Sequence, residues 1–152
     1  MIEHLVYKIK LGYYAPEQIL LRQFFRDDER FLFISGDGLL MIYKNVTTMK
    51  RVLLAQISKG HLIGDISLIF NSVPLESVTC KSYCNLAMIT EEDATYTMKL
   101  FPNVKVEIIS RVIENPYDPE RDYFVKLVKK RIPYFTKMPD RFLKKVYYRS
   151  LQ

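Results

Sequence analysis

The sequence has little of the chemistry from which metal centres and catalytic triads are built. Its 152 residues include two cysteines, two histidines and no tryptophan. Cys80 and Cys84 are too few for a disulfide framework or a four-ligand structural zinc site, which fits a reducing compartment. His4 and His61 stand in no serine and carboxylate context that would suggest a triad. We therefore expect a protein that is not an enzyme and holds no metal ion.

Long apolar runs and a leader pattern are also missing. No run approaches the ~20 residues that a membrane helix requires. The first residues, Met1–His4, lack the basic and then apolar plan of a signal peptide. A hydrophobic content of 49% supplies enough apolar material for one packed domain. We expect the chain to be soluble and cytoplasmic.

The positive charge is concentrated in the last third of the chain. Lysine and arginine exceed aspartate and glutamate by 23 − 17 = 6. Residues 1–100 carry eleven of each sign, whereas residues 101–152 carry twelve basic and six acidic side chains. A neutral body with a basic tail argues against a nucleic-acid binder and for one local contact surface.

The chain up to about Ile89 is predicted to be β structure. Short β-branched, aromatic and leucine runs alternate with turn residues at the spacing of a sandwich or barrel. Ser35–Gly38 contains two glycines and predicts a tight hairpin. The predicted strands are His4–Leu11, Ile19–Arg22, Arg30–Ser35, Leu39–Tyr43, Arg51–Ile57, Leu62–Ile66, Ser77–Thr79 and Asn85–Ile89.

Helical periodicity begins at Thr90, which is a typical N-cap followed by three acidic residues. The first predicted helix ends at Phe101, and others follow at Asn103–Glu114, at Glu120–Arg131 and from Pro139. We predict that residues 120–152 pack as helices against the β structure or a second subunit. The alternatives are a solvated basic face, or one that lies on acidic lipid or a partner. The apolar stripes to be buried are Phe124, Leu127 and Val128, and Phe142, Leu143, Val146 and Tyr147.

Two acidic clusters, Asp27–Glu29 and Glu91–Asp93, could be metal or acid/base groups. Each stands where an exposed loop or a helix start favours carboxylates, so we interpret both as structural. Residues 63–72 are more informative. A strand leads through Gly64 into a few helix-compatible residues, and such a turn leaves backbone N–H groups pointing the same way as an anion cradle.

This turn resembles the phosphate-binding cassette of cyclic nucleotide-binding domains, found in cAMP-dependent kinase regulatory subunits and cyclic-nucleotide-modulated channels. Gly64–Ile69 followed by Val78 is similar to the family pattern F-G-E-[IL]-[AS]-L-[LI], then R-[TA]-A-[ST]-V. The resemblance covers residues 5–114. It extends to Tyr14–Ile19, where Glu17 replaces the family's glycine, to Phe33–Gly36, and to Ser82–Leu86 through Pro102.

The resemblance implies a mainly β fold with flanking helices: an eight-stranded double-Greek-key β-roll followed by C-terminal α-helices. Residues 1–114 would form the roll and its first helices. Residues 115–152 would form a basic helical linker, and Ile132–Pro139 with Phe142 and Leu143 looks like the start of a second such domain. The partners implied are the rest of a larger polypeptide, a second such domain or another copy of the chain.

In the family, the glutamate after the glycine binds the ribose 2′-hydroxyl, and the following N–H groups and the arginine hold the cyclic phosphate. Here Pro74 stands at the arginine position, Glu76 replaces a small alanine, and Asp65 is one methylene shorter than glutamate. We therefore expect weak or lost binding of cAMP and cGMP, as in ether-à-go-go type channels, and no other cofactor. The corresponding residues are Gly64, Asp65, Ile66, Ser67, Pro74, Leu75, Ser77 and Val78, with Asn103–Glu114 as the lid.

The expected function is regulatory, within a gated ion channel and on the cytosolic side of its membrane. One alternative is a functional cAMP- or cGMP-sensing domain of a kinase regulator. An alternative of another class is an interaction domain whose basic helices bind a protein or acidic lipid.

Overall fold

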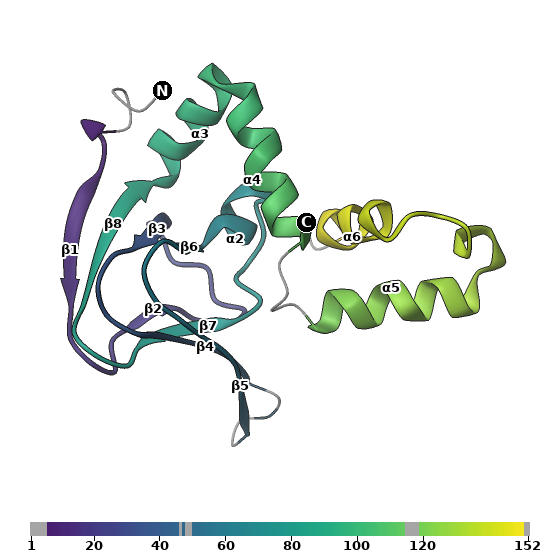
Figure 1. Cartoon of the computed structure of the whole chain (residues 1–152), viewed down its shortest axis with the longest axis horizontal. Coiled ribbons are helices and arrows are strands. Elements are labelled where there is room, and N and C mark those ends of the chain that lie inside the picture. Colours follow the sequence, from purple (N-terminus) through teal and green to yellow (C-terminus); the bar gives the residue numbers. More distant parts are fainter. Residues whose placement is uncertain (1–5, 46, 48–49, 115–118, 151–152) are drawn as a thin grey trace.

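Two four-stranded antiparallel sheets and a set of C-terminal helices make up the chain (Figure 1). The structure is a computed structural model that describes residues 6–45, 47, 50–114 and 119–150. The strands are β1 (Lys10–Tyr14), β2 (Ile19–Leu21), β3 (Phe31–Ser35), β4 (Leu40–Asn45), β5 (Arg51–Ile57), β6 (Leu62–Ile63), β7 (Ser77–Cys80) and β8 (Cys84–Thr90). The helices are α2 (Asp65–Ile69), α3 (Glu91–Leu100), α4 (Pro102–Glu114), α5 (Pro119–Arg131), the 3-10 turn η1 (Pro133–Phe135) and α6 (Asp140–Arg149).

The sheets have the orders β1-β8-β3-β6 and β2-β7-β4-β5, and apolar side chains from both fill the space between them. Alternate residues of a strand point to the same face, so β4 directs Leu40 and Ile42 inward, and β8 directs Cys84 and Leu86 inward. The predicted eight-stranded β-roll with C-terminal helices is confirmed for the described part of the chain.

Three details of the β prediction are wrong. The strand predicted at Leu62–Ile66 ends at Ile63, because the helix α2 begins at Asp65. The first strand is Lys10–Tyr14 rather than His4–Leu11, because the ladder with β8 runs from Lys10 opposite Met88 to Tyr14 opposite Cys84. Residues 6–9 are not strand, and residues 4 and 5 lie outside the described residues. The turn Ser35–Gly38 is not a hairpin, because β3 pairs with β6 and β8 whereas β4 pairs with β5 and β7. The turn therefore carries the chain from one sheet to the other.

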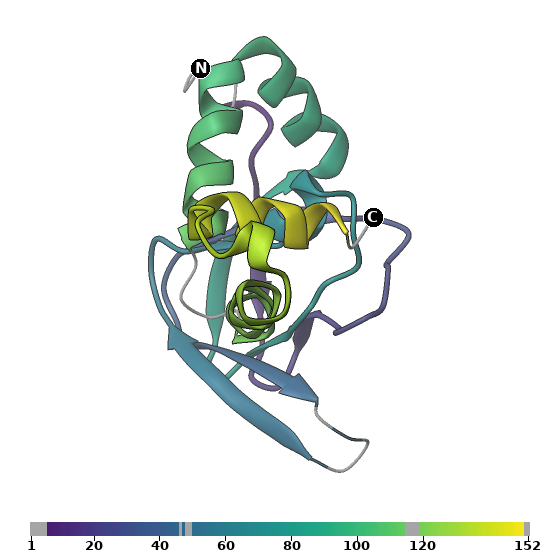
Figure 2. The same ribbon diagram turned by 90° about the vertical axis from the view of Figure 1, so that its right-hand side faces the viewer.

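The helical predictions hold closely. The side chain of Thr90 accepts a hydrogen bond from the Asp93 N–H and caps α3, as its sequence predicts. Helices α3 and α4 meet at a sharp turn and diverge from it, and α4 runs back toward α2 (Figures 1 and 2). The division between residues 1–114 and 115–152 stays a prediction. It falls at the end of α4, and residues 115–118 lie outside the described part.

Helices α5 and α6 form a hairpin that projects from the roll, and α6 lies against α4 (Figures 1 and 2). The ring of Tyr148 stacks on that of Phe70, which follows α2, with centroids 4.8 Å apart. Packing of the tail on the body is thus confirmed, but the expected stripes are only partly buried. Tyr147 and Leu143 are buried, whereas the remaining expected positions on α6, Phe142 and Val146, are exposed, as is Leu127 on α5.

Arg121, at the start of α5, joins three helices. Its side chain is 1% exposed, and its Nη1 donates to the carbonyl oxygens of Val112 and Ile113 at 3.3 and 3.0 Å. The same Nη1 lies 3.2 Å from the hydroxyl of Tyr148 on α6. The last turn of a helix leaves its carbonyls without intrahelical partners, and here a buried cation supplies those partners and complements the negative end of the α4 dipole.

Replacing this cation is expected to weaken the whole helical assembly. Arg121→Met keeps an apolar stem but leaves buried carbonyls without donors, so we expect a loss of about 2–4 kcal/mol in the free energy of unfolding. Urea denaturation followed by circular dichroism measures this. Arg149→Met, on the exposed side of α6, is the matched control and should change stability by less than about 0.5 kcal/mol. Equal effects from the two variants would contradict the role of Arg121.

Candidate functional site

The turn between β6 and α2 has the geometry that the sequence predicts for the cassette. Gly64 adopts φ 87° at the N-cap of α2, a conformation that side chains disfavour. A Cβ atom there would also lie 2.7 Å from the carbonyl oxygen of Phe31. Glycine is therefore required both by the backbone angle and by the close approach of β3.

The second N–H of α2, that of Ile66, is already hydrogen-bonded within the chain. The Ile66 N–H donates to Oδ1 of Asp65 at 3.0 Å, and the hydroxyl of Ser67 donates to the carbonyl of Gly64 at 3.1 Å. The short aspartate side chain thus folds back over the turn. An anion that approached the Ile66 N–H would have to displace a carboxylate.

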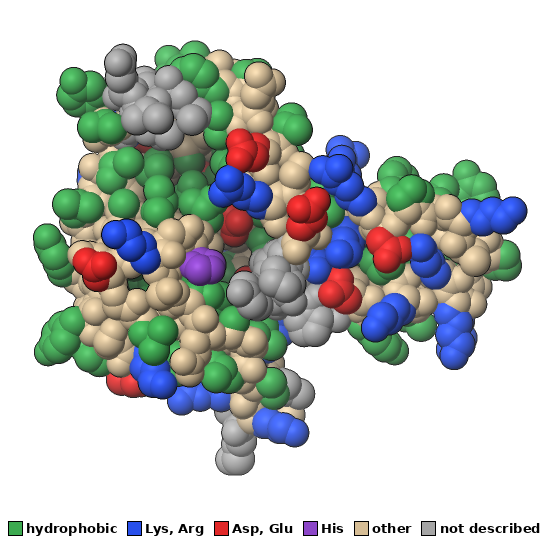
Figure 3. All heavy atoms as spheres, in the orientation of Figure 1, with side chains coloured by type: hydrophobic (Ala, Val, Ile, Leu, Met, Phe, Trp, Pro, Cys, Tyr) green, Lys and Arg blue, Asp and Glu red, His purple; other side chains and the backbone are tan. Residues whose placement is uncertain are grey.

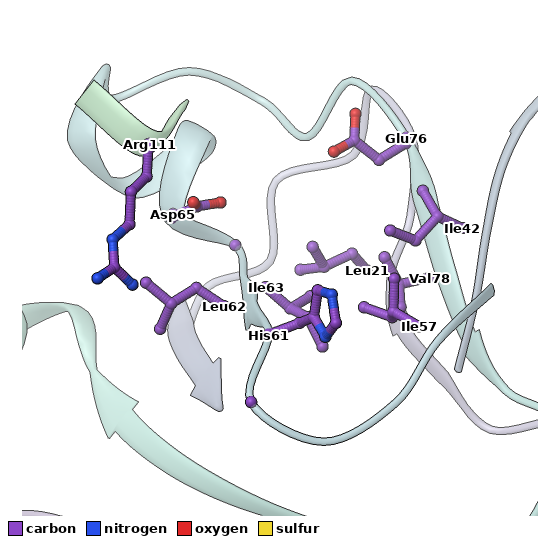
Figure 4. A pocket seen from close by; sticks show the side chains of 12 residues that line it. Leu21, Ile42, Ile57, His61, Leu62, Ile63, Asp65, Glu76, Val78 and Arg111 are labelled. Carbon is purple, nitrogen blue, oxygen red and sulfur yellow. The ribbon is translucent and has the colours of Figure 1, made fainter. Parts of the chain in front are cut away.

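A pocket of about 290 Å³ opens beside the turn (Figure 4). Its apolar wall comes from both sheets, because strands β2, β4, β5, β6 and β7 each direct a branched side chain into it. The members of this apolar wall are Leu21, Ile42, Ile57, Leu62, Ile63 and Val78. The polar residues of the pocket are His61, Asp65, Glu76 and Arg111.

The carboxylates of Asp65 and Glu76 approach the pocket from two sides and are directed toward the space between them (Figure 4). Arg111 reaches the rim from α4, but its Nη2 lies 2.7 Å from Oε1 of Glu107, one turn earlier on the same helix. Both side chains of that pair are about two-thirds exposed, at 68% and 65%. The charged side chains that line the pocket are thus two carboxylates, from Asp65 and Glu76, and the guanidinium of Arg111.

Burial opposes the ionisation of Asp65 in the pocket. Burial raises its pKa from 3.8 to about 6, although backbone hydrogen bonds from Ile66 and from Asp65 itself act in the opposite direction. At neutral pH it is therefore mainly ionised at the expense of fold stability.

Only some of the residues expected to bind the ligand line the pocket. Gly64, Asp65 and Val78 line the pocket, whereas Ile66 and Leu75 are buried in the cluster with α4 and α6. The others also lie outside the pocket lining. Pro74 and Ser67 line a separate small hollow, Pro74 accepts the Phe24 N–H at its carbonyl, and Ser77 accepts the Gln23 N–H at its hydroxyl.

Several pocket residues were not predicted from the sequence. The apolar wall comes from five strands that are distant in sequence, so no local pattern marks it. Arg111 lies on the helix expected to be the lid, and only its place on that helix could have suggested it. His61 was visible beside the turn glycine, and its Nδ1 lies 3.0 Å from the carbonyl oxygen of Ser58.

Of the two acidic clusters, Glu91–Asp93 has structural partners. Glu91 forms an ion pair with Arg30. The Asp93 carboxylate forms an ion pair with Lys8, and the Asp93 N–H donates to the hydroxyl of Thr90, the N-cap of α3. No group of three or more metal-ligating side chains occurs in the part of the chain that the structure describes. Among those residues, no helix is long and apolar enough to cross a bilayer.

Solved structures with the same arrangement are domains of larger regulatory proteins. The C-linker/CNBHD of zELK channels, crystallized in the presence of cAMP, has a TM-score of 0.59 and 25% identity over 75% of this chain and 56% of its own. A cAMP-independent protein kinase A regulatory subunit from Trypanosoma cruzi, bound to guanosine, has a TM-score of 0.62 and 13% identity over 83% of this chain and 41% of its own. cAMP-bound PfPKA-R has a TM-score of 0.56 and 16% identity over 94% of this chain and 44% of its own.

These matches establish the fold as that of cyclic nucleotide-binding domains. The chain spans about half of the length of these structures, or less. A cAMP-binding acyltransferase from Mycobacterium smegmatis also matches, so the fold occurs in enzymes as well as in regulators. No protein-family model and no curated protein matches the sequence.

The raised pKa of Asp65 predicts a pH-dependent stability. Its folded state binds a proton more tightly than its unfolded state, so the contribution is largest below pH 3.8 and is lost as pH rises through about 6. The difference corresponds to at most about 3 kcal/mol. Asp65→Asn retains an oxygen acceptor for Ile66 and should become more stable than the parent as pH rises from 4 to 7.5.

Urea denaturation at a series of pH values tests this difference. Asp28→Asn, in an exposed loop, is the matched control. A constant difference between Asp65→Asn and the parent across the range would show that the Asp65 carboxyl is not held in the less polar environment of the pocket.

Proposed function

We propose that this chain is a regulatory module of a larger protein, with the pocket of a cyclic nucleotide-binding domain but weak or lost binding of cAMP and cGMP. The charge of the pocket is the observation that carries the proposal. Asp65 and Glu76 line it, and Pro74 occupies the position of the cassette arginine. The cassette therefore supplies carboxylates, and no side-chain cation, where a cyclic phosphate would lie.

The expected loss of affinity for cyclic nucleotides follows from the cost of a buried charge that has no partner. A buried charge without its partner typically costs about 2–5 kcal/mol, which at ~1.4 kcal/mol per tenfold is roughly thirty-fold to several thousand-fold in affinity. Asp65 adds to this cost because its Oδ1 already holds the Ile66 N–H at 3.0 Å. A site that would otherwise be micromolar becomes sub-millimolar or millimolar.

A pocket of this fold can hold a ligand that has no phosphate. The neighbour from Trypanosoma cruzi is described as cAMP-independent and is bound to guanosine. This supports the proposal that the chain has the roll and helices of a cyclic nucleotide-binding domain but does not use a cyclic nucleotide as its ligand.

The parent that we propose is a gated ion channel, with the module on the cytosolic side of its membrane. The zELK channel domain, at 25% identity, supports this choice. A kinase regulator is the second candidate, because PfPKA-R matches 94% of the chain and so includes the α5–α6 hairpin. We propose a regulatory rather than catalytic role in either parent.

The α5–α6 hairpin favours a second role in contacts with another part of the parent protein. Lys and Arg side chains are dense over it (Figure 3). On the outer side of α6, exposed apolar residues alternate with basic ones at the spacing of one helical face, and an acidic or mixed partner surface would complement them. The residues of this outer side are Phe142, Lys145, Val146 and Arg149.

Because the cassette offers no side-chain cation to a cyclic phosphate, we expect cyclic nucleotides to leave the melting temperature of the chain unchanged. A micromolar ligand at a thousand-fold excess over its Kd adds about 4 kcal/mol and raises Tm by several degrees. We expect less than about 1 °C for the natural sequence with millimolar cAMP or cGMP, measured by differential scanning fluorimetry. A rise of several degrees would overturn the proposal.

A double variant provides the positive arm of this experiment. Pro74→Arg with Glu76→Ala restores a cation and removes a carboxylate, so a shift with cAMP should appear. Leu75 is left unchanged because it is buried against α4 and α6.

A further inference from the structure

The turn between α5 and α6, residues 130–137, is the tip of the α5–α6 hairpin and the part of the chain farthest from the roll (Figure 1). Two apolar side chains are exposed at this tip, Tyr134 at 75% and Ile132 at 42%. The ring of Tyr134 lies edge-on to that of Phe135, with centroids 5.4 Å apart. Leu143, farther along α6, is buried where the hairpin packs on the body. That packing therefore leaves the apolar side chains of the tip uncovered.

The charge around the tip is of one sign. Residues 123–139 include five lysine and arginine side chains and no aspartate or glutamate. Lys129 forms an ion pair with the aspartate at the start of α6. Lys130, Arg131 and Lys137 are exposed and have no acidic partner among the residues that the structure describes. Lys and Arg side chains thus surround hydrophobic ones at this end of the molecule (Figure 3).

The backbone of the tip makes its hydrogen bonds within itself. Four of its N–H groups donate to carbonyl oxygens three or four residues earlier, at 2.9–3.1 Å. These are the N–H groups of Ile132, Phe135, Thr136 and Met138. Pro133 has no N–H group that would need a partner. An unpaired backbone group is costly in an apolar medium, so this turn can leave water at a lower cost than an open loop.

We propose that the tip of the α5–α6 hairpin binds the surface of a membrane that contains anionic lipids. Tyr134 and Ile132 enter the boundary between headgroups and acyl chains, where tyrosine is characteristically found. The surrounding lysine and arginine side chains lie over the anionic headgroups. This assignment goes beyond the proposed function, because the tip is separate from the pocket and from the outer side of α6.

An acidic protein surface is the competing partner, and the shape of the tip argues against it. A stable protein interface buries about 800 Å² on each partner and needs complementary shapes. The tip offers two exposed apolar side chains on one projecting turn. A fluid bilayer adapts to a projecting shape, and a small apolar anchor with several cations is sufficient for reversible attachment to it.

Cosedimentation of the full 152-residue chain with sucrose-loaded vesicles tests the assignment. We expect binding to vesicles of phosphatidylcholine with phosphatidylserine to be at least about tenfold stronger than binding to phosphatidylcholine alone. Raising NaCl from about 0.1 M to about 0.5 M should release the chain, because salt screens the attraction to the headgroups.

A first pair of substitutions removes charge from the tip. Lys130→Gln with Arg131→Gln should weaken binding to the phosphatidylserine vesicles about thirtyfold. The matched control is Lys59→Gln with Lys81→Gln, which removes the same charge from exposed positions of the roll. This control pair should leave vesicle binding unchanged.

A second pair removes the apolar anchor and keeps the charge. Ile132→Ser with Tyr134→Ser should weaken vesicle binding about tenfold, because two side chains no longer leave water. The matched control is Val52→Ser with Tyr83→Ser, since these side chains of the roll are 41% and 79% exposed, close to the values at the tip. Circular dichroism confirms that each variant is folded.

The chain contains no tryptophan, so a single introduced one reports insertion directly. Tyr134→Trp should shift its fluorescence to shorter wavelength on addition of phosphatidylserine vesicles, because the indole leaves water. Tyr83→Trp is the control on the roll and should show no shift.

Three results would overturn the assignment. They are equal binding to vesicles with and without phosphatidylserine, equal effects of a tip pair and its control pair, and an equal fluorescence shift of Tyr134→Trp with soluble polyglutamate. The last result would assign the tip to an acidic protein surface. Failure of vesicle binding leaves the proposed function unchanged, and a rise in melting temperature with cAMP would overturn the proposed function without affecting the tip.

Discussion

The hydrogen bonds of the buried Arg121 guanidinium fix the helical half of the molecule. Nη1 lies within 3.3 Å of two carbonyl oxygens at the end of α4 and of the Tyr148 hydroxyl on α6. Taking a cation out of water is costly unless its donors are satisfied, and here Asp122 also accepts from Nε and Nη2. The result is one point at which the end of α4, the start of α5 and the end of α6 must coincide.

The position of the end of α4, which Arg121 fixes, also sets the position of one residue at the rim of the pocket. Arg111 precedes the carbonyls bound by Arg121 by one and two residues, so any movement of the end of α4 moves the basic side chain at the rim. On the opposite side, Arg30 donates to the carbonyl of Ser67 in α2 at 3.1 Å and pairs with Glu91. The cassette is thus held by a cation of the roll, Arg30, which binds the carbonyl of Ser67 rather than the N-terminal turn at Gly64.

The parts of the structure that could be predicted from the sequence depend on local chemistry. Thr90 followed by acidic residues marks a helix start because an N-cap satisfies N–H groups within three residues. Gly64 marks the cassette because only glycine tolerates both φ 87° and a carbonyl at the Cβ position. Glu17 has φ 68° at the place where the resemblance has a glycine, which shows that the turn survives a strained substitution.

The parts that could not be predicted depend on tertiary pairing. Ser35–Gly38 has the composition of a hairpin, but the neighbours of β3 and β4 are decided by strands distant in sequence. The periodicity of α6 likewise marks Phe142 and Leu143 as equally apolar. Only the position of the helix against α4 buries Leu143 at 1% exposure and leaves Phe142 at 49%. Periodicity identifies an apolar stripe but not which edge of it meets the body.

The short helix α2 connects the two halves of the molecule. Its first residue, Asp65, lines the pocket, whereas its second, Ile66, and the following Phe70 are buried against Val112, Tyr147 and Tyr148. Interiors are close-packed, so a rotation of α2 cannot be absorbed by empty space. The Asp65 position is thus joined through α2 to the stacked Phe70 and Tyr148 rings, and through Tyr148 to Arg121. The pocket and the α5–α6 hairpin are in this way two faces of one packed unit, whatever ligand the pocket holds.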